Sequence, residues 1–279
     1  MKKGKEKNDN SSRRIKKYSE LGFTDDFLFC KILQEDPEFC KEVVETILDV
    51  KIRKIIQLDK QQMIEKTPDG RGVRLDVYLE GDSAVYDIEM QNENPRNLPK
   101  RSRYYQGMID LNNLERGEDF NNLKKTVIAF ITTFDPFGRG LCRYTFRNTC
   151  VEVSGLELGD ESLKVFINAK GKETDDISPK MRDFLNYVMS ERVEGDFSRR
   201  LEDRVEKARR NTEWEMEYMT LEWKLEERYR TAKIEDAKAM LAEGISIEVI
   251  KKITGINPED LKESDESVSV SETEAIYNE

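Results

Sequence analysis

Two acidic residues in neighbouring segments are the strongest candidates for chemistry in this sequence. Apolar and polar residues alternate over residues 73–79 and again over residues 84–91, with a short Gly-Asp-Ser turn between the two runs. Side chains two residues apart on a strand share a face, so this pattern predicts a β-hairpin with Asp76 and Glu89 on one face. Two carboxylates so placed can bind one Mg²⁺ ion, which prefers oxygen ligands and can activate water for hydrolysis.

The register of the predicted hairpin decides how close the two acids lie. One register closes the turn over Gly81 and Asp82. It places Asp76 opposite Asp87, and Glu89 becomes the diagonal neighbour, with about 7–8 Å between Cα atoms. A shift of two residues places Glu89 directly opposite Asp76, and either register leaves both carboxylates on one face. The alternative is that this face is only the solvated side of an amphipathic hairpin, which is common in half-buried strands.

A basic segment follows the second alternating run. Residues 100–116 predict a helix, and no acid lies between Glu93 and Asp110. Positive charge at a helix N-terminus opposes the helix dipole, and DNA phosphate would resolve that conflict. The alternative is that these bases pair with acids of the sheet and that the tyrosines belong to the core. The residues expected to contact DNA are Lys100, Arg101, Arg103, Tyr104 and Tyr105.

The composition excludes several familiar kinds of catalytic site. The 279 residues contain no histidine, which removes Ser–His–Asp and Cys–His nucleophiles and histidine-ligated zinc or iron. The four cysteines form no CxxC pair and are too few for a disulfide scaffold. Any catalysis is therefore expected to depend on carboxylates, on lysine or arginine, and on a hard cation.

The charge and hydropathy predict no membrane partner. No apolar run approaches the roughly 20 residues that span a bilayer, and no apolar signal segment follows the basic N-terminus. Free cysteines without an export signal favour a cytoplasmic location. The net charge of −10 argues weakly against a protein that coats nucleic acid, but part of that charge lies in the terminal segments.

The remaining sequence predicts further strands and then charged helices. Residues 126–133 are a near-continuous apolar run, as in a central strand buried on both faces, and residues 141–146 and 162–167 are further strand candidates. Residues 180–243 contain no proline and predict a long charged helix, with an apolar stripe that indicates one buried side. Residues 246–263 have helix–turn–helix spacing. The second helix is short and acidic, which favours packing or oligomerisation over DNA reading.

Six short motifs follow one another in a fairly specific order. They are Asp26-Phe27-Leu28-Phe29, Arg74-Leu75-Asp76-Val77, Ile88-Glu89-Met90-Gln91, Arg101-Ser102-Arg103-Tyr104-Tyr105-Gln106, Gly117-Glu118-Asp119-Phe120 and Phe134-Asp135-Pro136-Phe137-Gly138. Over about residues 20–150 this set closely resembles the PD-(D/E)XK nuclease family transposases, also called recombination-promoting nucleases. The segment 242–255 also resembles the ending of that family.

The resemblance implies an α/β fold with a restriction-endonuclease-like core, in which a mixed central sheet is flanked by helices and followed by a long charged helical region. It implies a Mg²⁺-dependent (or Mn²⁺-dependent) DNA endonuclease linked to recombination or to mobile elements. Asp76 and Glu89 would be the metal ligands, with the Met90 carbonyl as a third. Asp26 would approach the metal or its water from a helix, and Gln91 stands where the superfamily has lysine.

The glutamine at position 91 raises a competing hypothesis. A lysine ammonium stabilises hydroxide or the developing phosphate charge, whereas a neutral amide can only orient water through hydrogen bonds. The resemblance implies that glutamine is normal at this position in the transposase branch of the superfamily, so nuclease activity is still expected. The glutamine suggests slow DNA cleavage or greater reliance on the metal. The competing function is a catalytically weak or inactive DNA-binding or assembly protein on the same scaffold. A third hypothesis makes the charged helix an interaction arm.

The expected organisation follows from these assignments. It comprises a flexible basic arm at residues 1–18, a PD-(D/E)XK nuclease-like domain at 19–178, a charged helical arm at 179–243, a small helical motif at 244–263 and a disordered acidic tail at 264–279. DNA is the expected partner, and the helical C-terminal region could join two copies of the chain as a homo-oligomer.

Overall fold

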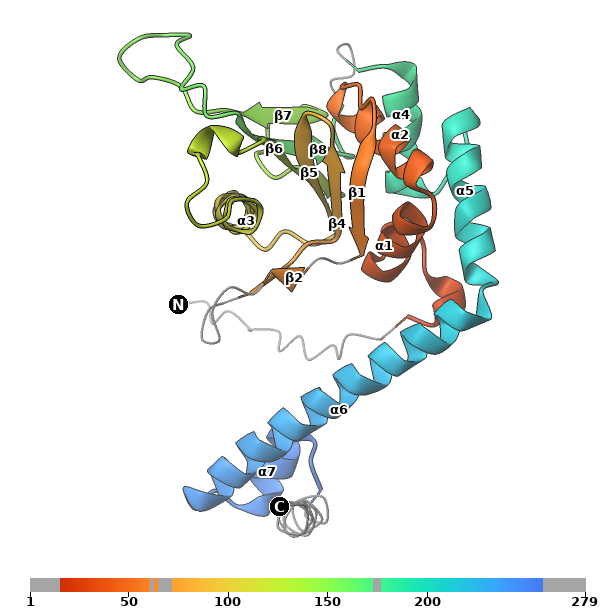
Figure 1. Ribbon diagram of the computed structural model, residues 1–279. Helices are drawn as coiled ribbons and strands as arrows, with labels where there is room; N and C mark the ends of the chain where they lie inside the picture. Colours follow the sequence, from red (N-terminus) through yellow and green to blue (C-terminus); the bar gives the residue numbers. More distant parts are fainter. Residues whose placement is uncertain (1–15, 61–62, 65–71, 173–176, 258–279) are drawn as a thin grey trace, which may run out of the picture. The chain divides into compact units, whose positions relative to one another are not determined.

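The computed structural model describes residues 16–60, 63–64, 72–172 and 177–257 (Figure 1). The chain divides into two compact units, of which the first is Lys16–Asn211 and the second includes the described residues 212–257. The acidic tail expected at 264–279 and most of the basic arm expected at 1–18 lie outside the described residues.

A mixed six-stranded sheet forms the centre of the first unit. Its strands lie in the order β1 (Ile55–Lys60), β4 (Val77–Gly81), β5 (Ala84–Gln91), β6 (Lys125–Thr132), β8 (Ser162–Asn168) and β7 (Arg143–Phe146). β5, β6 and β8 are parallel to one another, and the other neighbours are antiparallel. β2 (Met63–Ile64) and β3 (Val73–Arg74) form a separate two-stranded sheet. The expected mixed sheet is confirmed, including the buried strand predicted at 126–133, which is β6.

Helices cover both faces of this sheet (Figure 1). α3 (Leu98–Asn113) lies on one face, and α1 (Asp26–Glu35) and α2 (Pro37–Leu48) cover the other. α4 (Pro179–Ser190) and α5 (Asp196–Arg209) pack against α1 and α2. Short 3₁₀ turns, η1 (Tyr18–Glu20) and η2 (Phe120–Asn122), precede α1 and β6. α2 and α4 each begin with proline after a capping residue: Asp36 accepts from the Phe39 backbone N–H at 3.0 Å and Ser178 from that of Met181 at 3.1 Å.

The helix predicted over residues 180–243 is wrong as a single element. The chain forms α4, α5 and α6 (Thr212–Ala242), with breaks after Ser190 and after Arg209. Some charged side chains of this region form ion pairs within the domain. Arg200 of α5 makes two hydrogen bonds to Glu42 of α2, at 2.6 and 2.7 Å. These contacts hold α5 against α2, so the first compact unit extends to Asn211 instead of ending at residue 178.

The second unit contains α6 and α7 (Ile247–Thr254) in its described part. A small apolar cluster holds the two helices together around Ala237, Ile250 and Ile256. Ala237 is the buried residue of α6. Of the residues of the predicted apolar stripe, Trp214, Tyr218 and Leu221 are partly buried and Leu225 is exposed. The second helix expected at 258–263 lies outside the described residues. None of the described helices has the length and apolar content needed to cross a membrane.

Candidate active site

Asp76 and Glu89 face each other at the end of the β4–β5 hairpin. Val77 pairs with Ile88, so Asp76, one residue before β4, lies opposite Glu89. The Asp76 backbone N–H donates to Glu89 Oε1 at 3.0 Å, and the Met90 backbone N–H donates to Asp76 Oδ2 at 3.2 Å. The register that closes over Gly81 and Asp82 is therefore wrong, and the shifted register is the one observed.

The polar face of the hairpin is buried, not solvated. Asp76, Asp87 and Glu89 are 9%, 0% and 1% exposed. The α3 helix covers this face, where Tyr78 and Val85 of the hairpin belong to the same apolar cluster as Leu98 and Ile109 of α3. The alternative of an ordinary solvated face is wrong, because three carboxylates are removed from water at a large cost in hydration.

Asp26 reaches this cluster from the first turn of α1. A carboxylate oxygen of Asp26, a carboxylate oxygen of Asp76 and the Cys30 sulfur all lie within 4.8 Å of one another. The Asp26 side chain is largely exposed and accepts from the Arg74 guanidinium at 3.4 Å. A helix-borne acid thus approaches Asp76 at the edge of the site that is open to solvent.

Arg101 contacts the same cluster from the N-terminal part of α3. Its guanidinium donates to Glu89 Oε2 at 3.1 Å, to Gln91 Oε1 at 3.0 Å and to the Tyr105 hydroxyl at 2.7 Å. The alternative that the bases of this segment pair with acids of the sheet is therefore confirmed for Arg101. The pair also brings a permanent positive charge beside Gln91.

The other residues expected to contact DNA divide between two surfaces. Lys100, Arg101, Tyr104 and Tyr105 line one cavity of about 480 Å³, together with Arg74. Tyr105 is half-buried against Phe130, with ring centroids 6.3 Å apart, whereas Tyr104 is exposed. Arg103 does not line this cavity and lies instead on the side of α3 that faces β7 and β8.

Burial and mutual repulsion dominate the electrostatics of the cluster. Burial, followed by the charges of Glu89 and Asp26, raises the pKa of Asp76 well above its usual range. The pKa of Glu89 is also raised, because burial and Asp87 outweigh the hydrogen bond from Asp76 and the charge of Arg101. The carboxylates are held together without enough positive charge to balance them, which is the electrostatic environment that a divalent cation relieves.

Two residues of the cluster were not predicted. Asp87 is fully buried, neither of its oxygens has a hydrogen-bond partner among the described residues, and burial raises its pKa well above the usual range. Asp87 lies two residues before Glu89 on the same alternating strand, so the sequence already indicated that the two side chains share a face. Cys30 lies one helical turn after Asp26, and that spacing on an amphipathic helix is too common to single it out.

The donor set fits a hard cation. Carboxylate oxygens from Asp26, Asp76 and Glu89 and a backbone carbonyl at Met90 are oxygen ligands of the kind that Mg²⁺ and Mn²⁺ take, whereas the Cys30 thiol is a softer donor. Met90 and Asp76 are already neighbours through their hydrogen bond. The Arg101 contact occupies one Glu89 oxygen, so a bound ion would share that carboxylate with a guanidinium.

Comparison with known protein families assigns both parts of the chain. Residues 24–145 match the PD-(D/E)XK nuclease family transposase model, and residues 230–264 match the C-terminal HTH domain of the Rpn/YhgA-like nuclease family. No curated protein and no solved structure matched the chain. The first match contains Asp26, Asp76, Glu89 and the whole of α3, and it identifies the mixed sheet as a restriction-endonuclease-like fold. On these two matches, the part of the chain that holds the carboxylates is similar to the PD-(D/E)XK nuclease family transposases, and the C-terminal part is similar to the HTH domain of the Rpn/YhgA-like nucleases.

Proposed function

We propose that this protein is a metal-dependent DNA endonuclease that hydrolyses phosphodiester bonds in recombination or in the movement of mobile elements. One observation supports this function above the others. Carboxylate oxygens of Asp26 and Asp76 lie within 4.8 Å of each other, and Glu89 accepts from the Asp76 backbone N–H and from Arg101, which lines a cavity together with the bases Arg74 and Lys100. Acids that bind a cation and bases that bind phosphate are the two parts that this hydrolysis needs.

The proposed metal ligands are Asp76, Glu89 and the Met90 carbonyl, with Asp26 close to the ion or its water. A bound Mg²⁺ or Mn²⁺ supplies an activated water and neutralises charge that develops on the phosphate. The chain itself orients these ligands, because backbone N–H groups of Asp76 and Met90 each hold one carboxylate oxygen. The Asp76 and Glu89 carboxylates are thus oriented before the metal and the DNA bind.

Arg101 and Gln91 have complementary parts in this proposal. The Gln91 amide can orient water by hydrogen bonding but carries no charge. The Arg101 guanidinium, 3.0 Å from Gln91 Oε1, supplies the nearby positive charge. Lys100 and Tyr104 line the adjacent cavity and are the proposed contacts to the DNA backbone.

DNA is the proposed partner of both units. The HTH domain adds a second element of a class that binds DNA, and α7 carries Lys251 and Lys252 in its last turn. This differs from the packing role expected for that segment from its acidic second helix. The cytoplasmic location and a homo-oligomer through the C-terminal helices stay predictions.

A catalytically silent DNA-binding or assembly protein is the second candidate function. The observation that favours it is the Arg101–Glu89 ion pair, at 3.1 Å, on a carboxylate that would have to bind the metal. Combined with a neutral amide at Gln91, this pairing would weaken cleavage while leaving DNA binding intact.

Cleavage of supercoiled plasmid by the purified full chain with Mg²⁺ separates the two functions. The wild type is expected to nick the plasmid, EDTA to stop it, and Glu89→Gln or Asp76→Asn to reduce it by at least about 100-fold. Glu80→Gln is the matched control, since Glu80 is a carboxylate of the same hairpin that pairs with Lys124 away from the cluster. Nicking by Asp76→Asn at the wild-type rate would show that the assigned site is wrong. Salt-sensitive DNA binding without any nicking would select the silent function.

A further inference from the structure

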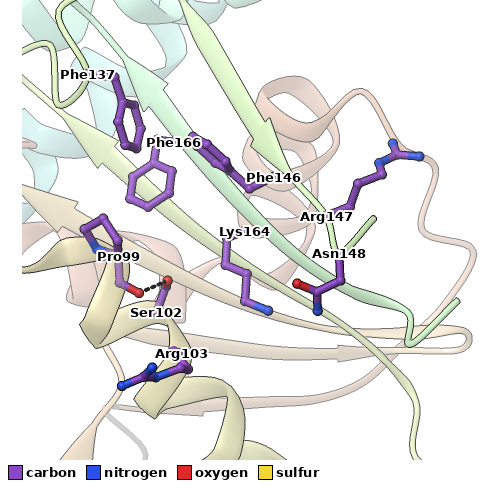
Figure 2. A pocket seen from close by; sticks show the side chains of 9 residues that line it. All are labelled: Pro99, Ser102, Arg103, Phe137, Phe146, Arg147, Asn148, Lys164 and Phe166. Carbon is purple, nitrogen blue, oxygen red and sulfur yellow. Dashed lines mark hydrogen bonds between the residues drawn. The ribbon is translucent and has the colours of Figure 1, made fainter. Parts of the chain in front are cut away.

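A second cavity lies on the α3 face of the sheet, beside β7 and β8 (Figure 2). Its volume is about 340 Å³, and aromatic and cationic side chains line it together. That volume is at the small end of the roughly 300–1,000 Å³ typical of ligand sites. The cavity therefore suits a single small group better than a stretch of folded protein or a duplex.

Three phenylalanine rings form one end of the cavity. Phe137 lies 4.9 Å from Phe146 and 5.0 Å from Phe166, and Phe146 lies 5.7 Å from Phe166, all between ring centroids. Phe146 is 44% exposed, whereas Phe166 is buried beneath it. An exposed ring on a packed aromatic base is a surface on which a flat apolar group can stack.

The loop that carries Phe137 is held rigidly. The Asp135 carboxylate accepts hydrogen bonds from the backbone N–H groups of Phe137, Gly138 and Gly140, at 2.8–3.1 Å, and from the Tyr144 hydroxyl at 2.8 Å. The rings are therefore in place before any ligand arrives, which lowers the entropy cost of binding.

Polar groups form the other end of the cavity. Figure 2 shows the Lys164 amine and the Arg103 guanidinium on the side away from the rings, and Arg147 pointing away from both. Arg103 has no ion-pair partner among the described residues, whereas Lys164 contacts the Ser162 hydroxyl and Arg147 pairs with Glu157. The Asn148 amide also lines this end and is held by Asp160 at 2.7 Å. Arg103 and Lys164 are thus the two cations that can take an anionic group.

This cavity is close to the carboxylate cluster on the same face. Glu89 pairs with Phe130 of β6, and Phe130 pairs with Phe166 of β8, so the three residues form one row across the sheet. Two strand spacings separate Glu89 from Phe166, a distance on the order of 10 Å. Arg101 and Arg103, two residues apart on α3, face the cluster and the cavity respectively.

We propose that the Phe146 cavity binds one unpaired nucleotide of the DNA, with its base stacked on Phe146 and its phosphate held by Arg103 and Lys164. The cavity's chemistry, an open aromatic face with two cations at the far end, matches a base joined to a phosphate. A base inside a duplex has both faces covered by its neighbours, so only an unpaired or flipped base can stack there. The proposal rests on DNA being the substrate and deepens it, because it selects DNA with unpaired positions next to the cleavage site.

The test measures binding without cleavage. The full chain is titrated in EDTA against a fluorescent single-stranded oligonucleotide and against the duplex of the same sequence, by fluorescence anisotropy. Phe146→Ala is expected to weaken single-strand binding by about 5- to 150-fold, the loss typical for removing one base-stacking aromatic residue. Duplex affinity is expected to change less than twofold.

Two further variants keep the result interpretable. Phe120→Ala removes an aromatic ring that is 79% exposed and does not line the cavity, and it is expected to bind both DNAs as the wild type does. Phe146→Trp keeps a stacking surface and is expected to retain single-strand binding, which separates lost stacking from lost folding.

The proposal is overturned if Phe146→Ala binds single strands as the wild type does, or if it loses single-strand and duplex affinity equally. It is also overturned if Phe120→Ala loses as much as Phe146→Ala. Because EDTA removes the metal, a selective loss in Phe146→Ala supports the cavity even if no cleavage is ever observed. Metal-dependent cleavage with no effect of Phe146→Ala supports the nuclease and rejects the cavity.

Discussion

The two faces of the central sheet differ in what they bury. The strand residues that alternate with the α3-facing cluster lie on the face covered by α1 and α2, and the following ones are apolar and buried: Val77, Leu79, Ile88, Val127, Ala129, Ile131, Val165 and Ile167. On the α3 face, the same strand β5 buries Asp87 and Glu89. Among the described residues, the buried carboxylates of the sheet therefore lie on the α3 face alone.

This difference separates the source of stability from the source of chemistry. Buried aliphatic side chains on the first face favour folding through the hydrophobic effect. The carboxylates on the second face lose hydration and repel one another, which costs stability. Such a cost is typical of sites where function requires charges to be close together.

The largest predicted effects come from neighbouring residues on opposite faces. Ile88→Ala is expected to lower the free energy of unfolding by about 2–5 kcal/mol, because it leaves a cavity in a closed apolar core. Glu89→Gln is expected to leave that free energy equal or higher and to lower cleavage by at least about 100-fold. Urea unfolding and plasmid nicking measure the two effects. An unstable Glu89→Gln protein would break the proposed separation of the two faces.

The sequence predicted which residues share a face, but not whether the face is buried. Period-2 alternation was enough to place Asp76 and Glu89 together. The register of the hairpin was not predictable, because it depends on which two residues form the turn. In the structure β4 ends at Gly81 and β5 begins at Ala84, so the turn residues are Asp82 and Ser83. Burial of Glu89 depends on α3 packing over it, a contact between elements that no local pattern reports.

The helical residues show the same limit. Positive charge at the start of α3 was visible in the sequence, but the helix phase that turns Arg101 toward Glu89 and Arg103 toward Phe146 depends on tertiary packing. The breaks after Ser190 and Arg209 were missed because no proline marks them. At the first break Glu191 adopts a left-handed conformation with φ 53°, which a glycine would have signalled.

A smaller effect of opposite sign is predicted for Asp87. Replacing this buried carboxylate, which has no hydrogen-bond partner among the described residues, by leucine is expected to raise the free energy of unfolding by about 1–3 kcal/mol. Leucine has a similar volume, and the position pairs with Ile128 of β6. Thermal unfolding at neutral pH measures the change. A lower free energy of unfolding in Asp87→Leu would contradict the claim that the buried Asp87 carboxylate costs stability.

An acid-dependent effect is predicted on the other face, between α2 and α5. Hydrogen bonding from Arg200, opposed by partial burial and helped by Lys180, lowers the pKa of Glu42 to about 2. Because the pKa of Glu42 is lower in the folded protein than in the unfolded chain, the ionised carboxylate stabilises the fold at pH values above its ordinary pKa. That stabilisation is lost as the pH falls toward 2. Glu42→Gln is therefore expected to cost on the order of 1 kcal/mol at neutral pH, after allowance for solvent screening, and less near pH 3.

The exposed acid on the same helix is the control for this pH effect. Glu38 pairs with Lys41 only at 3.9 Å and its side chain is 83% exposed. Glu38→Gln is expected to leave urea unfolding unchanged at both pH values. An equal loss in both variants, or a loss in Glu42→Gln that does not depend on pH, would contradict the ion-pair assignment.

The smallest predicted effect concerns the surface charge beside the carboxylates. Lys100→Ala is expected to weaken DNA binding for all sequences alike and to make the slope of log affinity against log salt shallower by about 1, as for one lost phosphate contact. Lys51→Ala, which removes an exposed base on the other side of the domain's core near α2, is the control. An unchanged slope in Lys100→Ala would remove Lys100 from the proposed DNA surface.

The central claim is that the carboxylates opposite one another on the hairpin bind one divalent ion. Calorimetric titration of Mn²⁺ into the full chain measures it directly. The account predicts that the wild type and Glu80→Gln bind Mn²⁺ alike and that Asp76→Asn binds at least about tenfold more weakly. Equal Mn²⁺ affinity in Asp76→Asn and the wild type, or no binding by either, would contradict it.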